Sequence, residues 1–84
     1  MAESLCILGI KINDRIKEAG NVQRVLTQFG CSIKTRVGLH EVTDSHCSTS
    51  GLVILELTGP QGDQEKMKKE LGAIQGITVK TMEF

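Results

Sequence analysis

The 84-residue chain has almost no aromatic side chains: it contains no tryptophan and no tyrosine, and its two phenylalanines are Phe29 and Phe84. Many RNA-binding domains stack bases on aromatic side chains. Charge of one sign is lacking too, because 10 basic residues are balanced by 10 acidic ones. A nucleic-acid partner is favoured by an excess of basic residues that releases counterions from the phosphate backbone. We therefore expect no direct contact with nucleic acid.

Paired cysteines and long apolar runs are also missing. Cys6, Cys31 and Cys47 are an odd number without a C-x-x-C spacing, which favours free thiols in a reducing compartment. The apolar runs are far shorter than the roughly 20 residues that a membrane-spanning helix needs. The N-terminal segment has no basic region before its apolar run, as a secretion signal would have. We expect a cytoplasmic protein with no membrane partner.

What is present is a clear alternation of strand and helix patterns in a chain long enough for one domain, residues 1–84. Residues 5–12 and 52–58 are apolar on both faces of a period-two pattern, which is typical of central strands. Residues 31–42 have one apolar and one polar face, as an edge strand has, and residues 77–82 form a short closing strand.

Two helices complete the pattern. Residues 15–29 repeat apolar side chains at spacings of three and four after Asn13 and Asp14, which offer an N-cap oxygen. Met67, Leu71 and Ile74 mark a second helix that Asp63 can cap, and residues 43–51 read as a hairpin loop or a frayed strand end. The order predicts an α+β, ferredoxin-like βαββαβ fold, with an antiparallel sheet of strand order 4-1-3-2 and both helices on one face.

This fold leaves the other face of the sheet open. Alternation assigns to the helix side Cys6, Leu8, Ile10, Ile12, Val53, Leu55 and Leu57. It leaves in the middle of the open face Leu5, Ile7, Leu52 and Ile54, ringed by Lys34, Arg36, Glu56 and Lys80. An apolar patch with a charged rim is typical of an interaction surface. We predict a homo-oligomer, a dimer or tetramer, formed through these four residues or through sheet edges; the alternative is a monomer with an apolar face.

Several short segments carry a resemblance to a known family. The run Asn13-Asp14-Arg15, the helix end at residues 25–30 and the strand start at residues 31–33 resemble the opening of an ACT domain. More closely, residues 36–39, Gly59 and residues 76–80 are similar to the small ACT-like proteins of the iron-only hydrogenase system regulator family. The resemblance covers nearly the whole chain. It implies a ferredoxin-like fold, an oligomer and a regulatory role, and a fold relation to the ligand domain of nickel-responsive repressors.

The chain departs from both related groups in residues that bind ligands. Amino-acid-binding ACT domains usually carry glycine directly after the Asp-Arg pair, where this chain has Ile16. The nickel-responsive repressors use histidine and cysteine ligands around the third strand, and residues 52–58 contain neither. A ligand site is expected at the turn after the first strand and on the second strand, and its candidate residues are Asn13, Asp14, Arg15, Arg36 and His40.

Other chemistries have weaker support. His40, His46 and Cys47 could bind a soft metal, but they lack the usual ligand spacings, and whether they do so is open. No third residue completes a Cys–His nucleophilic pair. Cys6 and Cys31 are expected in the core, too far apart for a disulfide, and residues 59–62 form a plain turn. We predict no catalytic residue, no metal and no cofactor.

The leading interpretation is a small oligomeric regulatory or ligand-sensing module without its own DNA-binding domain, and not an enzyme. The alternative is a structural interaction subunit that docks on another protein through the open sheet face. The effector and the partner are not identified by the residues.

Overall fold

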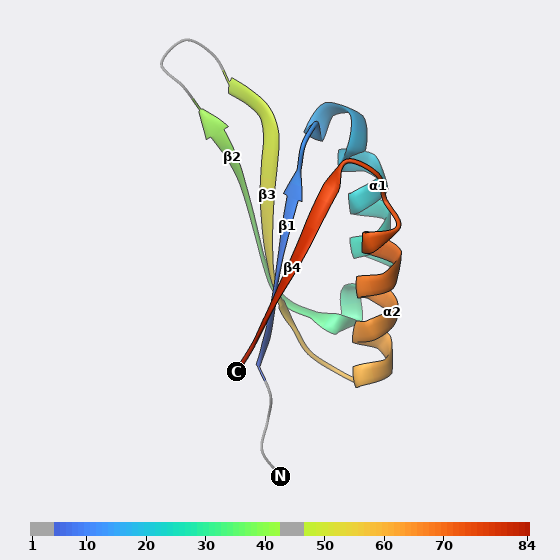
Figure 1. Cartoon of the computed structure of the whole chain (residues 1–84). Coiled ribbons are helices and arrows are strands. Elements are labelled where there is room, and N and C mark those ends of the chain that lie inside the picture. The colour runs from blue at the N-terminus through green and yellow to red at the C-terminus, as the bar shows by residue number, and fades with distance from the viewer. Residues whose placement is uncertain (1–4, 43–46) are drawn as a thin grey trace.

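A computed structural model describes residues 5–42 and 47–84. Its elements, in chain order, are β1 (Cys6–Ile12), α1 (Arg15–Gln28), a short 3-10 helix η1 (Gly30–Ser32), β2 (Ile33–Val42), β3 (Cys47–Leu57), α2 (Gln61–Gly72) and β4 (Ile77–Glu83). The strands form one antiparallel 4-stranded sheet in the order β2-β3-β1-β4. Both helices lie on one face of this sheet (Figure 1). The predicted fold class, strand order and helix placement are confirmed.

The core lies between the sheet and the helices. Every residue that alternation assigned to the helix side of β1 and β3 is buried, and Leu8, Ile10 and Leu55 have no exposed surface. The helices contribute Val22, Val25, Leu26, Met67 and Leu71, which are also buried. Apolar side chains recur every second residue along the strands and every third or fourth residue along the helices, so both place them on the facing surfaces that form this core. Among residues 5–42 and 47–84, no helix is both long enough and apolar enough to span a membrane.

The third strand begins earlier than the sequence pattern predicts. It starts at Cys47 rather than Leu52, and its first residues pair only with β2, from Val42 opposite Cys47 to His40 opposite Gly51. This part of the hairpin extends past β1, which meets β3 from Gly51 onward (Figure 1). A polar sequence can form strands there because the ladder of an antiparallel pair is made by main-chain groups. The predicted loop residues 43–46 lie outside the described part.

The segment between α1 and β2 also differs from the prediction. Cys31 was expected at the start of a strand and in the core, but it lies in η1 and is exposed, while Cys6 is buried as expected. The chain needs a tight turn to leave α1, and the 3-10 helix that supplies it buries Ser32 instead. Asp63 was expected to cap α2, but the cap residue is Pro60 and Asp63 lies in the first turn.

A bulge in β2 reverses the faces that the sequence pattern predicts. Ile33 lies opposite Leu57, but the next pair is Thr35 opposite Glu56, so Lys34 is an extra residue in the strand. From there on Arg36, opposite the buried Leu55, shares the helix side. The prediction that Arg36 belongs to the rim of the open face is therefore wrong, because it assumed an unbroken alternation through residues 31–39.

Candidate functional site

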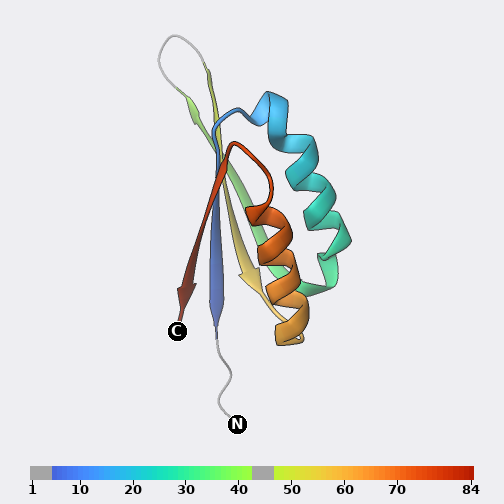
Figure 2. The ribbon, with the colours of Figure 1, turned by 45° about the vertical axis from the view of Figure 1, so that its right-hand side comes forward.

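The open face of the sheet carries a continuous group of apolar side chains, which we call the open-face patch: Leu5, Ile7, Val37, Leu52, Ile54 and Met82. Registers place Ile7 opposite Met82 and Val37 opposite Ile54, so the patch crosses all strands of the sheet. Leu5 and Leu52 are 39% and 38% exposed, Val37 is 45% and Met82 is 55% exposed. The turned view shows both helices on the opposite side (Figure 2). No described part of the chain shields the patch.

The sequence pattern predicts four members of the patch, Leu5, Ile7, Leu52 and Ile54, but not Val37 or Met82. Val37 was assigned to the other side because the bulge at Lys34 leaves no mark in the pattern of apolar residues. Met82 was recognised as part of a strand, but only its register opposite Ile7 shows that it extends the patch. The signal for Met82 was available in the predicted strand order.

Polar groups border the patch at the end where β2 begins. The Thr35 hydroxyl donates a hydrogen bond of 2.9 Å to the Glu56 carboxylate, and the Lys34 ammonium lies 3.9 Å from the same carboxylate. Lys80 lies opposite Gly9 on the same face, on the edge strand β4. The predicted rim residues Lys34, Glu56 and Lys80 thus remain beside the patch, without Arg36.

A hollow of about 580 Å³ lies at the same end of the sheet, where β3 turns into α2. It is lined by Leu5, Lys34, Glu56, Leu57, Thr58, Gly59, Gln61 and Gln64. Small-molecule sites usually have volumes of roughly 300–1,000 Å³ and a few polar groups that orient the ligand. Here the polar groups of the lining are the ammonium of Lys34, the carboxylate of Glu56 and the side-chain amides of Gln61 and Gln64. The sequence pattern predicts only a turn at residues 59–62.

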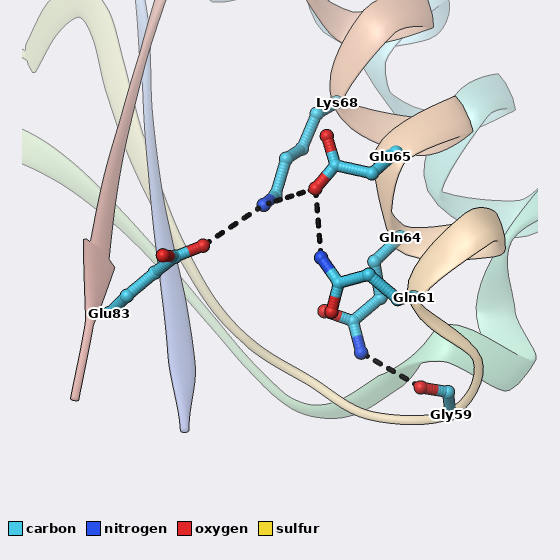
Figure 3. Close-up of polar contacts among 6 residues, drawn as sticks. All are labelled: Gly59, Gln61, Gln64, Glu65, Lys68 and Glu83. Atoms are coloured by element: carbon cyan, nitrogen blue, oxygen red, sulfur yellow. Dashed lines mark hydrogen bonds and ion pairs between the residues drawn. The ribbon is translucent and has the colours of Figure 1, made fainter. Parts of the chain in front are cut away.

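The turn and helix beside the hollow are held by a set of polar contacts (Figure 3). The side-chain amide of Gln64, which is only 8% exposed, donates a hydrogen bond of 3.0 Å to the Gly59 carbonyl. Gly59 has a φ of +82°, a left-handed conformation that favours glycine. The Gly59 main chain and the Gln64 side chain that bonds to it together form the wall of the hollow at this turn.

A second chain of contacts joins α2 to β4 (Figure 3). Gln61 donates 2.9 Å to the carboxylate of Glu65, and the Lys68 ammonium lies 3.2 Å from Glu65 and 3.7 Å from Glu83. The hydrogen bonds from Lys68 and Gln61 lower the pKa of Glu65. Partial burial opposes the charged form of Lys68, but its hydrogen bond with Glu65 and the neighbouring acidic groups outweigh it and raise the pKa of Lys68.

The predicted ligand residues at the first turn cap the helix and fix the turn. The main-chain N–H of Asn13 donates a hydrogen bond of 2.9 Å to the Gly76 carbonyl, and the main-chain N–H of Lys17 donates one of 3.3 Å to the Asp14 carboxylate. Asp14 is therefore the predicted N-cap of α1. The side chain of Arg15 lies outside the described part of the structure.

The other two predicted ligand residues lie on β2, at different heights. His40 and Ile12 both lie opposite Gly51, so His40 is roughly 10 Å from the end of β1, two strand spacings away. Arg36 is four residues further along β2, roughly 13 Å away, and its guanidinium donates a hydrogen bond to the Gln23 side chain on α1. The structure therefore places His40 at the same end of the sheet as Asn13 and Asp14. Arg36 lies away from that end.

The metal site suggested by His40, His46 and Cys47 depends on side chains outside the described part of the structure. Within residues 5–42 and 47–84, no three His, Cys, Asp or Glu side chains gather where they could hold a metal ion. His46 lies outside the described residues, and the side chains of His40 and Cys47 are likewise not described.

Comparisons with known proteins agree with this architecture. No protein-family model matches the chain, and no curated protein matches it either. An uncharacterized protein from Thermotoga maritima, TM1266, has a solved structure with 28% identity, a TM-score of 0.79, and alignment over 98% of this chain and 99% of that protein. The whole chain is thus similar to one complete small protein.

More distant structures share the fold. CPII of Thiomonas intermedia K12, solved with ADP, AMP and acetate, has a TM-score of 0.60 at 10% identity, over 96% of this chain and 86% of that one. Its apo form, described as a nitrogen regulatory PII-like protein, has a TM-score of 0.59 at 13% identity, over 98% and 90% of the two chains. These likenesses establish a small ferredoxin-like, ACT-like fold. The narrower resemblance to the iron-only hydrogenase system regulators stays a prediction.

Proposed function

We propose that this chain is a small regulatory module that binds a small ligand, associates with copies of itself through the open-face patch, and acts by binding rather than by catalysis. The open-face patch is the observation that carries the proposal. Contiguous exposed apolar surface with a polar rim marks interaction sites on soluble proteins. In this chain the patch spans the whole width of the sheet, so one flat contact can bury all of it at once.

The free energy gained by burying the open-face patch favours a self-association that depends on concentration. Fully burying one large apolar side chain is worth about 1.5–3 kcal/mol, and Leu52 and Met82 already have part of their surface covered. Association costs several kcal/mol of lost translational and rotational freedom before any gain appears. Burial of the whole patch is therefore needed, and loss of one central member should weaken the oligomer strongly.

The hollow beside the patch is the place where the described residues best accommodate a small ligand. Lys34 and Glu56 offer one charge of each sign, and Leu5 and Leu57 offer apolar surface. Leu5 and Glu56 belong to, or border, the face through which association is proposed. A ligand in the hollow would therefore touch the surface that a second copy covers, which is how ligand binding and assembly become linked.

Sedimentation velocity between about 5 and 500 μM tests the association. The wild-type chain should shift from monomer to oligomer, and Ile54→Lys, which would bury a charge in the open-face contact, should lose that contact and form smaller species than the wild type at the highest concentration. Ala73→Lys adds the same charge at an exposed position at the end of α2 and should associate like the wild type. A monomeric wild-type chain at 500 μM contradicts this part of the proposal.

Thermal shift with a defined panel tests the ligand. ADP, AMP and acetate are included because CPII, of the same fold, was solved with them. Free amino acids are added because some of the ACT domains that this chain resembles bind amino acids. A ligand that binds the folded chain raises the melting temperature. The shift should be lost in Lys34→Ala and kept in Lys80→Ala, which removes an exposed lysine away from the hollow. If no compound shifts the melting temperature while the chain still associates, the interaction-subunit alternative is favoured over the sensor.

A further inference from the structure

We infer that the free edge of β4 pairs with β4 of a second copy, joining two sheets into one continuous antiparallel sheet. This contact is separate from the open-face association proposed above and uses main-chain groups instead of an apolar face. The order β2-β3-β1-β4 places β2 and β4 at the two edges of the sheet, and Figure 1 shows β4 at the edge opposite β2. An exposed edge is a template for strand addition.

Two hydrogen bonds show which main-chain groups of β4 point outward. The Asn13 amide donates 2.9 Å to the Gly76 carbonyl, and the Phe84 amide donates 2.9 Å to the Leu5 carbonyl. In an antiparallel pair, successive residues turn their main-chain groups alternately toward and away from the neighbouring strand. Residues 78, 80 and 82 therefore bond to β1, and residues 77, 79, 81 and 83 present their N–H and C=O groups at the free edge.

The two edges of the sheet differ in how well they suit strand addition. The pairing of β2 with β3 shifts register twice, between Ile33 and Thr35 and between His40 and Val42. Such bulges bend and twist an edge, which hinders the addition of another strand. The pairing of β4 with β1 runs without a shift from Ile77 to Glu83, and no proline interrupts it. The regular edge is therefore β4.

Side chains of β4 leave this edge accessible. Lys80 lies opposite Gly9 and so projects from the open face, perpendicular to the edge. Glu83 lies opposite the buried Cys6 on the other face, and its carboxylate is 3.7 Å from the Lys68 ammonium on α2. Neither charged side chain is directed along the sheet plane, where a neighbouring strand would approach.

The edge is complementary to itself under two-fold symmetry. With the symmetry axis at Thr81, Val79 pairs with Glu83 of the partner subunit, and Lys80 lies across from Met82 of the partner subunit. With the axis at Lys80, two lysines would face each other, which is destabilising. The Thr81 register also brings together the parts of the two open-face patches that end at Met82. A second copy therefore satisfies the main-chain groups, avoids the charge clash and continues the apolar surface.

Amide exchange measured by NMR tests the contact on the unmodified chain. At about 5 μM the amides of Val79, Thr81 and Glu83 should exchange at rates close to those of an unpaired strand, while those of Lys80 and Met82 should be protected by β1. At about 500 μM the three outward amides should become protected as well, by at least tenfold. If they still exchange rapidly while the chain is oligomeric, the inference is overturned, although the open-face association can still hold.

Thr81→Pro provides the matching variant. Proline is tolerated in an edge strand where the lost N–H faces solvent, so the variant should keep the protection of the inward amides and weaken association at least tenfold. Thr81→Val keeps the N–H and should associate like the wild type. Thr81→Pro that associates normally contradicts edge pairing. If Ile54→Lys associates like the wild type while Thr81→Pro does not, the open-face association is contradicted and the edge pairing is retained. If Thr81→Pro does not fold, the exchange measurement on the wild-type chain still decides.

Discussion

The two faces of the sheet are built from the same strands and similar side chains, yet they have opposite surroundings. On β3, Leu55 is completely buried under the helices, while its neighbour Ile54 is only half-buried on the open face. On β1 the same contrast separates Leu8 from Ile7. The helices provide enough apolar surface for one face alone. The difference shows that apolar residues alone do not determine whether a face of a strand is buried, because burial also needs an element that covers that face.

Replacing one residue on each face should show the largest difference. Leu55→Ala leaves a cavity in a packed core and should lower the free energy of unfolding by about 2–5 kcal/mol. Ile54→Ala, at the adjacent position, removes side chain that is partly solvated in the monomer, and should cost less than about 2 kcal/mol. Urea unfolding followed by circular dichroism at about 5 μM measures both.

Measuring the free energy of unfolding of Leu55→Ala and Ile54→Ala at a second protein concentration separates the two faces further. Unfolding at about 500 μM should increase the cost of Ile54→Ala, because association stabilises the folded chain and this variant weakens it. The cost of Leu55→Ala should stay constant, since that side chain lies inside one chain. Equal costs for the two variants at 5 μM would show that the two faces do not differ as described.

Most of the fold was predictable because its layers follow from periodicity. Two-faced apolar strands identified β1 and β3 as central, and the chain order then fixed the position of β2 and β4. Features that depend on local geometry were not predictable. The extra residue at Lys34 changes no apolar spacing, yet it moves Arg36 from the open face to a contact with Gln23. Similarly, the exposure of Cys31 depends on a 3-10 turn that the sequence does not mark.

The candidate site was predicted less completely than the fold. Alternation placed Leu5 and Leu52 correctly, because Leu5 directly precedes β1, Leu52 lies in β3, and the pairing of β1 with β3 has no register shift. It could not find the hollow, since that space depends on how the turn at Gly59 lies against the sheet, held by the buried side chain of Gln64. Pairwise contacts between distant segments are not encoded in a local pattern of residue types.

Gly9 offers a smaller test of how free the open face is. A β-carbon added there would meet only the Ile54 side chain, at 3.9 Å, an ordinary contact. Glycine inside a strand costs roughly 0.5–1 kcal/mol relative to alanine, so Gly9→Ala should raise the free energy of unfolding by about that amount at 5 μM. Gly59→Ala, at a φ of +82°, should instead lower it. A loss of stability in Gly9→Ala would mean that the open face is more tightly packed than its exposure indicates.

Lys68 belongs to the border between the covered face and the edge at β4, and its effect should be the smallest. Lys68→Met should lower the free energy of unfolding by at most about 1 kcal/mol at pH 7, the usual range for ion pairs near the surface.

The contribution of this ion pair should depend on pH. The pKa of Lys68 is raised from 10.5, so its contribution is complete below that pH and is lost as pH rises through the higher value in the folded chain. The pKa of Glu65 is lowered from 4.5, so its contribution is present above pH 4.5 and is lost as pH falls through the lower value. The difference between wild type and Lys68→Met in urea melts should therefore be constant between pH 4.5 and 10.5 and shrink on both sides. Lys66→Met, an exposed lysine on the same helix, is the control for loss of charge alone, and a profile identical to that of Lys68→Met would show that the link between α2 and β4 contributes nothing to stability.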